Sequence, residues 1–165
     1  DPPVKARIKE ILEATSINPT SGYLETTETT LVEDNESTVA TINALRDLDL
    51  RLAIDDFGTG YSSLLYLKRF PVGVLKIDRS FVSGLGSNSE DEVIATTIIS
   101  LAKALELEVV AEGVENKHQL DRMRELGCDY GQGYWFGRPI TIEATDVAII
   151  EPLRQSPLSL NPLNP

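Results

Sequence analysis

The sequence predicts a parallel α/β fold, because five short β-favouring stretches alternate with segments whose apolar residues recur at helical spacing. Such alternation is typical of strand–helix units that are joined by right-handed crossovers and share one parallel sheet. A further observation is that each expected strand ends in acidic, basic or amide residues, which indicates a site at the carboxyl ends of the strands. Periodicity alone leaves two architectures open, a doubly wound sheet and a (β/α)8 barrel.

The strands are expected where β-branched and aromatic residues lie between helical segments. In chain order they are 22–27, 50–54, 72–77, 108–111 and 130–136. Five strands with their helices make about five βα units.

The helices are expected where apolar residues recur three or four positions apart. The first is entered through Pro2, and the fifth begins at Asn116 with Gln119 three residues on, which is a capping-box pattern, and stops at Gly127. The apolar faces in order are Val4, Ile8, Ile11 and Leu12; Val39, Ile42, Leu45 and Leu48; Leu64, Leu65 and Leu67; Ile94, Ile98, Leu101 and Leu105; and Leu120, Met123 and Leu126.

The chain is long enough for one domain with a hydrophobic core, which we expect to occupy residues 1–140. Residues 141–165 are expected to form a final amphipathic helix and a flexible tail rich in Pro, Asn and Leu. No apolar run approaches the roughly 20 residues that span a bilayer, so no membrane contact is expected from this segment. The single cysteine, Cys128, excludes an internal disulfide and favours a reducing, cytoplasmic location.

The formal net charge of −11 argues against DNA or RNA as a partner, because nucleic-acid binders need a basic surface. A phosphate-bearing substrate would also be repelled unless cations lay between it and the protein.

The polar residues at the strand ends predict a metal site. Carboxylates brought close together cannot all remain ionised unless something positive lies among them, and oxygen ligands favour Mg²⁺ or Mn²⁺. Two such ions about 3.5–4 Å apart activate a water and hold the attacking and leaving oxygens of a phosphodiester. The strand-end residues are Glu25 and Glu28; Asp55 and Asp56; Lys76 and Asp78; Glu112 and Glu115; and Gln132.

Each of these residues also has a plainer interpretation. A lone strand-end carboxylate is more often a helix cap or a solvated turn, and Lys76 with Asp78 fits a structural ion pair as well as a catalytic unit. Cys128 and Trp135 are expected in the core, and His118 on the surface. By their chemistry alone, the residues predict a metal-dependent site in a parallel α/β fold and nothing more specific.

Four blocks of the sequence carry a resemblance to a known family. They are DDFGTGYSSL at 55–64, LKID at 75–78, AEGVE at 111–115 and GCDYGQGY at 127–134. In order and approximate spacing they resemble the signature blocks of EAL-domain phosphodiesterases, and the likeness runs from about Pro3 to Pro139. The resemblance implies a modified TIM barrel that hydrolyses cyclic-di-GMP to linear pGpG with Mg²⁺ or Mn²⁺.

The resemblance also implies roles for the strand-end residues. Those similar to metal ligands are Glu25, Asp55, Asp56 and Glu112. Those predicted to act in catalysis are Lys76, which is similar to the lysine that contacts the catalytic water, with Asp56 and Glu112. Gln132 and Asp78 are predicted to bind substrate. Glu28 and Glu115 are supporting carboxylates, and Glu28 is expected to steady the loop from Phe57 to Ser63, through which such domains often form homodimers.

Two departures from the family pattern stand out. Thr26 replaces a usual aliphatic residue, and the Glu-Ala-Leu tripeptide is absent, together with an asparagine ligand and a substrate-binding arginine expected upstream of Asp1. A (β/α)8 barrel needs about 250 residues, so we expect an N-terminally truncated, incomplete barrel with an incomplete two-metal site. The leading hypothesis is a phosphodiesterase of which this chain alone is weak or inactive. The alternative is a non-catalytic cyclic-di-GMP receptor or interaction module.

Overall fold

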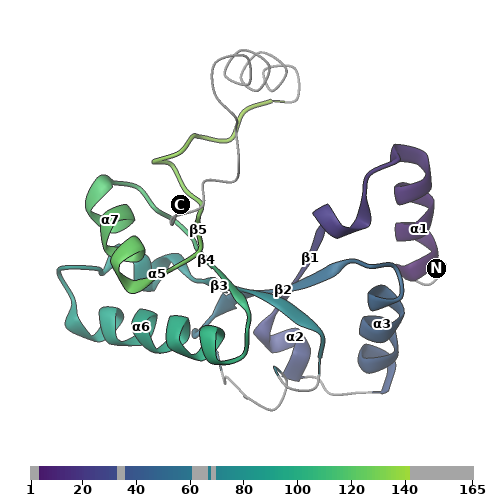
Figure 1. Ribbon diagram of the computed structural model, residues 1–165, viewed down its shortest axis with the longest axis horizontal. Coiled ribbons are helices and arrows are strands. Elements are labelled where there is room, and N and C mark those ends of the chain that lie inside the picture. Colours follow the sequence, from purple (N-terminus) through teal and green to yellow (C-terminus); the bar gives the residue numbers. More distant parts are fainter. Residues whose placement is uncertain (1–3, 33–35, 61–66, 68–69, 142–165) are drawn as a thin grey trace.

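The five predicted strands form one parallel sheet in a computed structural model, which describes residues 4–32, 36–60, 67 and 70–141 (Figure 1). The strands are β1 (Tyr23–Thr27), β2 (Arg51–Phe57), β3 (Val72–Ile77), β4 (Glu108–Ala111) and β5 (Tyr130–Gly131). Their order in the sheet is β1-β2-β3-β4-β5, and every neighbouring pair is parallel. A doubly wound sheet reverses its direction at a switch point. The unbroken order is instead that of the wall of a barrel.

The helices lie in two groups along the sheet. Figure 1 shows α1 and α3 beside the end of the sheet formed by β1 and β2, and α5, α6 and α7 beside β3, β4 and β5. The helices are α1 (Val4–Thr15), α2 (Glu28–Val32), α3 (Glu36–Arg46), α5 (Arg79–Ser83), α6 (Ser89–Ala104) and α7 (Lys117–Leu126), with a 3-10 turn at Pro19–Ser21. The helix expected around 61–70 lies largely outside the described residues, as does the expected C-terminal helix. The short helices α2 and α5 were not predicted.

The hydrophobic core lies between the helices and one face of the sheet. Because strand side chains alternate between faces, every second residue of β2, β3 and β4 points into it. The strand residues of this core are Leu52, Ile54, Phe57, Leu75, Ile77, Val109 and Ala111, and α6 adds Ala95, Ile98, Ile99 and Ala102. Each fully buried aliphatic side chain contributes about 1.5–3 kcal/mol relative to exposure, so this face provides most of the stability of the fold.

Helix α7 confirms the predicted capping signals. The Asn116 side chain accepts from the Gln119 backbone, the Gln119 side chain accepts in return from the Asn116 backbone N–H, and Gly127 ends the helix with φ 84°. Helix α1, in contrast, has no buried residue, and an ion pair of 3.0 Å joins its Lys5 to Asp47 after α3. Of the predicted apolar face of α1, Val4 and Ile11 are exposed, whereas Ile8 and Leu12 are half-buried.

The last strand was predicted too long. β5 ends at Gly131, and Gly133 (φ 155°) then turns the chain, because its missing side chain leaves room for the backbone of Val114. Trp135 follows this turn and is 47% exposed, so the expectation that it belongs to the core was wrong. Cys128 is fully buried and His118 is exposed, as predicted, and burial raises the pKa of the Cys128 thiol to about 12.

Candidate metal centre

The strand-end side chains gather on the sheet face opposite the core. Glu25, Asp55 and Lys76 occupy the alternate positions of β1, β2 and β3, and Glu112 directly follows β4. A hollow of about 630 Å³ lies over this face and is lined by Glu25, Lys76 and Gln132 among others. The convergence expected at the carboxyl ends of the parallel strands is therefore present.

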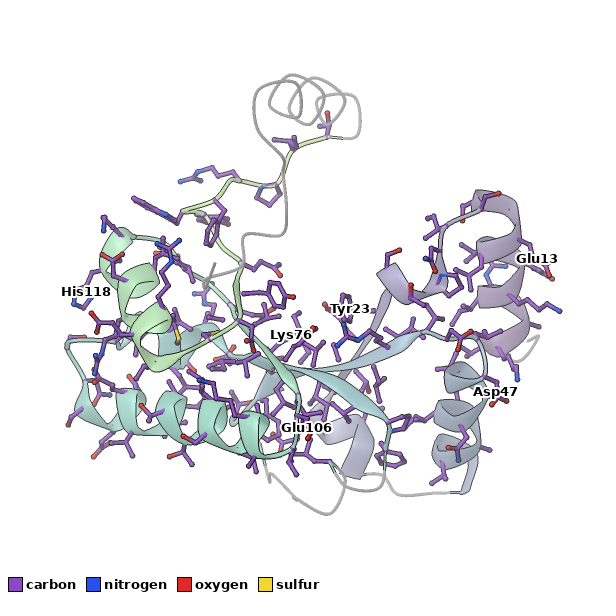
Figure 2. All side chains as sticks on the ribbon, viewed as in Figure 1. Glu13, Tyr23, Asp47, Lys76, Glu106 and His118 are labelled. Atoms are coloured by element: carbon purple, nitrogen blue, oxygen red, sulfur yellow. The ribbon has the colours of Figure 1, made fainter. Side chains whose placement is uncertain are left out.

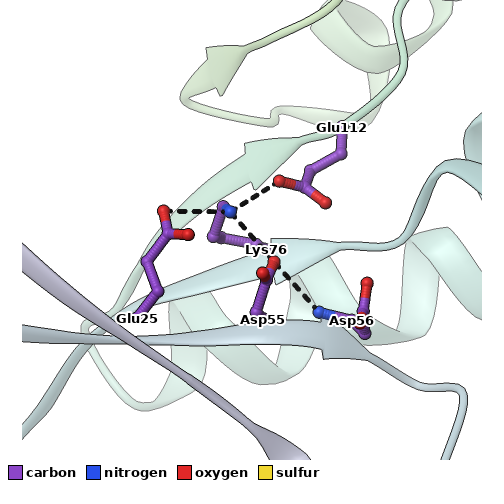
Figure 3. A network of polar contacts seen from close by, with 5 residues as sticks. All are labelled: Glu25, Asp55, Asp56, Lys76 and Glu112. Atoms are coloured by element: carbon purple, nitrogen blue, oxygen red, sulfur yellow. Dashed lines mark hydrogen bonds and ion pairs between the residues drawn. The ribbon is translucent and has the colours of Figure 1, made fainter.

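Lys76 lies in the middle of three carboxylates (Figure 3). Its Nζ lies 2.6 Å from Glu112 Oε1, 2.9 Å from Asp55 Oδ1 and 3.0 Å from Glu25 Oε1. Its side chain is only 7% exposed. Burial on its own would lower the pKa of Lys76, but hydrogen bonds to Glu112, Asp55 and Glu25 outweigh it and raise the pKa above the usual lysine value. Lys76 is therefore a permanent cation at neutral pH.

A β-bulge brings Asp55 and Asp56 to the same side. Successive strand residues normally point to opposite faces, but the register of β2 against β3 shifts between Ile54 and Phe57, and Asp56 adopts φ 53°. This left-handed conformation costs about 1–2 kcal/mol for a residue other than glycine. In return, carboxylate oxygens of Asp55, Asp56 and Glu112 lie within 4.8 Å of one another.

The electrostatic environment favours protons on two of these carboxylates. Burial raises the pKa of Glu112, Lys76 opposes the rise, and the charges of Asp55 and Asp56 add to it. Burial also raises the pKa of Asp56, together with the charges of Asp55 and Asp78. The cluster thus holds more negative charge than Lys76 alone relieves.

A divalent cation fits this arrangement. Oxygens on opposite sides of an ion with bonds of about 2.1 Å are about 4.2 Å apart, which is close to the 4.8 Å limit within which the oxygens of Asp55, Asp56 and Glu112 lie. The ligands are hard oxygen donors, the type that Mg²⁺ and Mn²⁺ prefer. The three carboxylates can therefore hold an ion after small side-chain adjustments. Glu25 lies close by, because it pairs with Lys76.

Asp78 has a partly structural role. Its Oδ1 caps α5 by accepting from the Ser80 backbone N–H at 2.9 Å, and the Ser80 hydroxyl also donates to it. These hydrogen bonds outweigh burial and lower the pKa of Asp78. Among the described contacts Lys76 pairs with the three carboxylates above and not with Asp78, so the ion pair considered from the sequence is not observed.

Glu28 lies beneath the loop after β2. Its side chain is buried, neither carboxylate oxygen has a hydrogen-bond partner among the described residues, and a Cβ on Gly60 would lie 3.2 Å from its Oε2. Gly58 (φ 98°) is needed in the same loop, because a Cβ there would lie 2.9 Å from Ile98. Residues 61–63 of the loop lie outside the described part of the chain.

Two predicted site residues stand apart from the cluster. Gln132 follows β5, lines the hollow with its exposed side chain, and donates its backbone N–H to Ala111 at 2.8 Å. Glu115 is exposed before α7, and its backbone N–H donates to Gln119 Oε1 at 2.8 Å. No described contact joins the Glu115 side chain to the carboxylates around Lys76.

A second polar cluster was not predicted. Tyr23, Arg51 and Glu108 lie on the same sheet face, near the amino ends of β1, β2 and β4. The signal was present in the sequence, because Tyr23 precedes Glu25 by two residues and Arg51 precedes Asp55 by four. An even separation along a strand places both side chains on one face.

Comparisons with known proteins identify one family. A model of the EAL domain matches residues 1–139. The bifunctional diguanylate cyclase/cyclic di-GMP phosphodiesterase MucR of Pseudomonas aeruginosa is 42% identical over 136 residues, which are 82% of this chain and 20% of MucR. The cyclic di-GMP phosphodiesterase NbdA of the same organism is 43% identical over 139 residues, which are 84% of this chain and 18% of NbdA. The chain thus spans about a fifth of the length of these curated relatives.

Solved structures of EAL proteins also match most of this chain. The PaMucR phosphodiesterase in complex with c-di-GMP superposes with a TM-score of 0.78 at 41% identity, over 84% of this chain and 56% of that one. The EAL domain of Mycobacterium smegmatis DcpA gives 0.81 at 39% identity, over 89% and 66%. Klebsiella pneumoniae BlrP1, in a manganese and cyclic-di-GMP complex, gives 0.78 at 31% identity, over 84% and 36%.

Proposed function

This chain belongs to the EAL domain family, and from that premise we propose that it forms the metal-binding part of a phosphodiesterase that hydrolyses cyclic-di-GMP to linear pGpG. The observation that carries the proposal is the approach of Asp55, Asp56 and Glu112 to within 4.8 Å, beside a lysine that three carboxylates surround. An acidic protein gains from such a centre, because a cation in it offsets the repulsion of a phosphate-bearing substrate.

We propose that Glu25, Asp55, Asp56 and Glu112 hold two ions, Mg²⁺ or Mn²⁺, in a site that further ligands outside this sequence complete. When bound, divalent ions lower the pKa of a water and stabilise the charge on a phosphodiester. The manganese complex of BlrP1 supports this assignment. Because part of the ligand set is absent from this sequence, the chain by itself is expected to be weak or inactive.

The remaining residues act on water and substrate. Since the pKa of Lys76 is raised, its ammonium orients the attacking water and neutralises charge but does not accept a proton. Asp56 and Glu112 have raised pKa values in the metal-free protein; a divalent cation would lower these pKa values, so we propose that both residues act in catalysis as ionised ligands. Gln132 lines the hollow beside Lys76 and Glu25, and Asp78 lies close enough to Asp56 for its charge to raise the pKa of that residue, positions that suit contact with the bound dinucleotide.

We place the protein in the cytoplasm, with the cyclic dinucleotide as its partner and no DNA or RNA, and we propose a homodimer contact through the loop 57–63. Glu28 lies against Gly60 of that loop, and we propose that it supports the loop. No described contact supports the same role for Glu115. In the described part of the chain, every helix is too short or too polar to cross a membrane.

The test is turnover by the complete protein. Incubation with cyclic-di-GMP and Mg²⁺ or Mn²⁺ should yield pGpG, and D55A should abolish the product while thermal unfolding changes little. D47A is the matched control, because Asp47 is an exposed aspartate whose ion-pair partner is Lys5. Retained turnover in D55A would contradict the metal assignment.

The alternative function is a receptor that binds cyclic-di-GMP without cleaving it. Binding with no pGpG in either metal would support it. The intact set of Glu25, Asp55, Asp56 and Glu112 favours the enzyme, since a receptor has no need of the strained Asp56 backbone. Calcium, a larger ion with looser geometry, should support binding but not hydrolysis.

A further inference from the structure

The lower cluster, defined as Tyr23, Arg51 and Glu108, links three strands at their amino ends. Arg51 Nη2 lies 2.8 Å from Glu108 Oε2, and Arg51 Nη1 donates to the Tyr23 hydroxyl at 3.0 Å. That hydroxyl donates to Glu108 Oε2 at 3.4 Å, and the guanidinium lies 5.1 Å from the centroid of the Tyr23 ring. The three side chains thus form a closed set of contacts around one cation.

Arg51 reaches Glu108 by crossing a strand. β3 lies between β2 and β4 in the sheet, and the guanidinium passes over it at Gly73. A Cβ on Gly73 would lie 3.1 Å from Arg51 Nε and 3.4 Å from Arg51 Nη2. A Cβ at this position would therefore crowd the crossing Arg51 side chain, and a larger side chain would crowd it further.

The lower cluster holds the same three strands that supply the carboxylates around Lys76. Tyr23 precedes Glu25 by two residues on β1, Arg51 precedes Asp55 by four on β2, and Glu108 precedes Glu112 by four along β4 and its end. At about 3.3 Å per residue, the two levels are about 7–13 Å apart along the strands. Figure 2 shows Tyr23 and Lys76 on the same side of the sheet.

Glu25 is the carboxylate that most needs this support. Its side chain is the most exposed of the three carboxylates around Lys76, at 51% against 26% for Asp55 and 19% for Glu112. It pairs with Lys76 at 3.0 Å. If β1 moved away from β4, Glu25 would leave Lys76 while Asp55 and Glu112 stayed with it.

We propose that the lower cluster positions Glu25 by fixing the curvature of the sheet between β1 and β4, with Arg51 as the positioning residue. The link to metal binding rests on the function proposed above. Arg51 acts through strand placement and does not touch the ions or the substrate. Its loss should therefore weaken the binding of the ion that uses Glu25, and leave the ion held by Asp55, Asp56 and Glu112.

The deciding variant is G73V, since it blocks the crossing of Arg51 but puts a strand-favouring residue into β3. R51M removes the cation itself. The matched control is R122M, because Arg122 forms an ion pair with Glu92 between α7 and α6, away from the sheet. The side chains of Arg122 and Glu92 are 33% and 29% exposed, which is similar to the 36% and 34% of Arg51 and Glu108.

In crystals of the metal-free complete protein, G73V and R51M should lose the contact between Glu25 and Lys76, and R122M should keep it. In Mn²⁺ titrations by calorimetry, G73V and R51M should weaken one of two ions about 10-fold, in the range seen for residues that orient ligands. R122M should stay within about 2-fold. The reversed pair R51E/E108R should restore much of the affinity, because it rebuilds the ion pair.

The proposal is overturned if G73V and R51M keep the contact between Glu25 and Lys76, or if R122M weakens Mn²⁺ binding as much as they do. A protein that binds no Mn²⁺ at all would instead refute the proposed function. The metal-free crystals would still decide whether the lower cluster positions Glu25.

Discussion

The two faces of the sheet are built from alternate residues of the same strands, yet one face is apolar and the other is charged. On the helix-covered face, Ile54, Leu75 and Val109 are almost completely buried and apolar. On the other face, carboxylates converge on Lys76, and burial together with the neighbouring carboxylate charges raises the pKa values of Glu112 and Asp56. Burial stabilises the first face, whereas gathered charge destabilises the second until a cation joins it. Stability and the proposed chemistry therefore depend on different residues, which can be changed independently.

The largest expected effect is on the polar face. Glu112→Gln keeps the shape of the side chain but removes a ligand charge, so turnover of cyclic-di-GMP by the complete protein should fall by about 1,000-fold or more. The midpoint of thermal unfolding should change little. Product formation and circular dichroism melting check both results. Turnover within about 10-fold of the parent would mean that Glu112 is not a ligand.

The next effect is on the apolar face. Leu75→Ala should lower the free energy of unfolding by about 2–5 kcal/mol, because Leu75 is fully buried and its removal leaves a cavity. Urea denaturation measures the loss. Mn²⁺ affinity below the unfolding transition should be unchanged. A large loss of affinity in L75A would show that the two faces are coupled.

Lys76 does not fit the division into a buried apolar face and a charged face, because it is buried and charged. The variant Lys76→Met tests this residue. The substitution leaves three carboxylates without their cation, and we expect the metal-free protein to lose about 1–2 kcal/mol. This is less than for a fully buried pair, because the carboxylates are partly exposed. Mn²⁺ should bind several-fold more tightly, since the ammonium no longer competes, yet turnover should be lost. Isothermal calorimetry and product assays separate these outcomes, and weaker Mn²⁺ binding would contradict the competition.

The smallest expected effect is on pH dependence. The pKa values of Asp56 and Glu112 are raised in the folded state, so over this window the folded protein binds more protons than the unfolded one. The contribution of these groups to stability should therefore grow as the pH of metal-free protein is lowered from neutral towards the ordinary glutamate value of 4.5. Mn²⁺ affinity should fall over the same range. Denaturation of D56N at several pH values should show a flatter profile, and an unchanged profile would contradict the assignment.

Much of the fold could be predicted because its signals are local. The bounds of β3 and β4 follow from β-favouring residues between turns, and α7 follows from its capping box and Gly127. The convergence of polar strand-end residues on Lys76 could be predicted because parallel strands end at one edge. The short helices α2 and α5, five residues each, are too brief for a 3.6-residue period to be detected.

The features that were predicted wrongly or missed are ones that tertiary contacts determine. Strand β5 stops at Gly131 because the chain turns at Gly133, against the backbone of Val114. Residue preferences cannot show such a contact. Trp135 was placed in the core for its apolar character, but the turn exposes it. The reach of Arg51 across β3 depends on sheet curvature and on Gly73, and neither is a property of the local sequence.

The left-handed backbone at Asp56 has a consequence for how this protein can change over time. Glycine and asparagine adopt that conformation at least as readily as aspartate, so either replacement leaves the bulge unstrained and the neighbouring pocket in shape. Both replacements remove a charged oxygen donor. If the proposed function holds, a single exchange that the architecture accepts would therefore be enough to remove cleavage of the nucleotide and leave its binding.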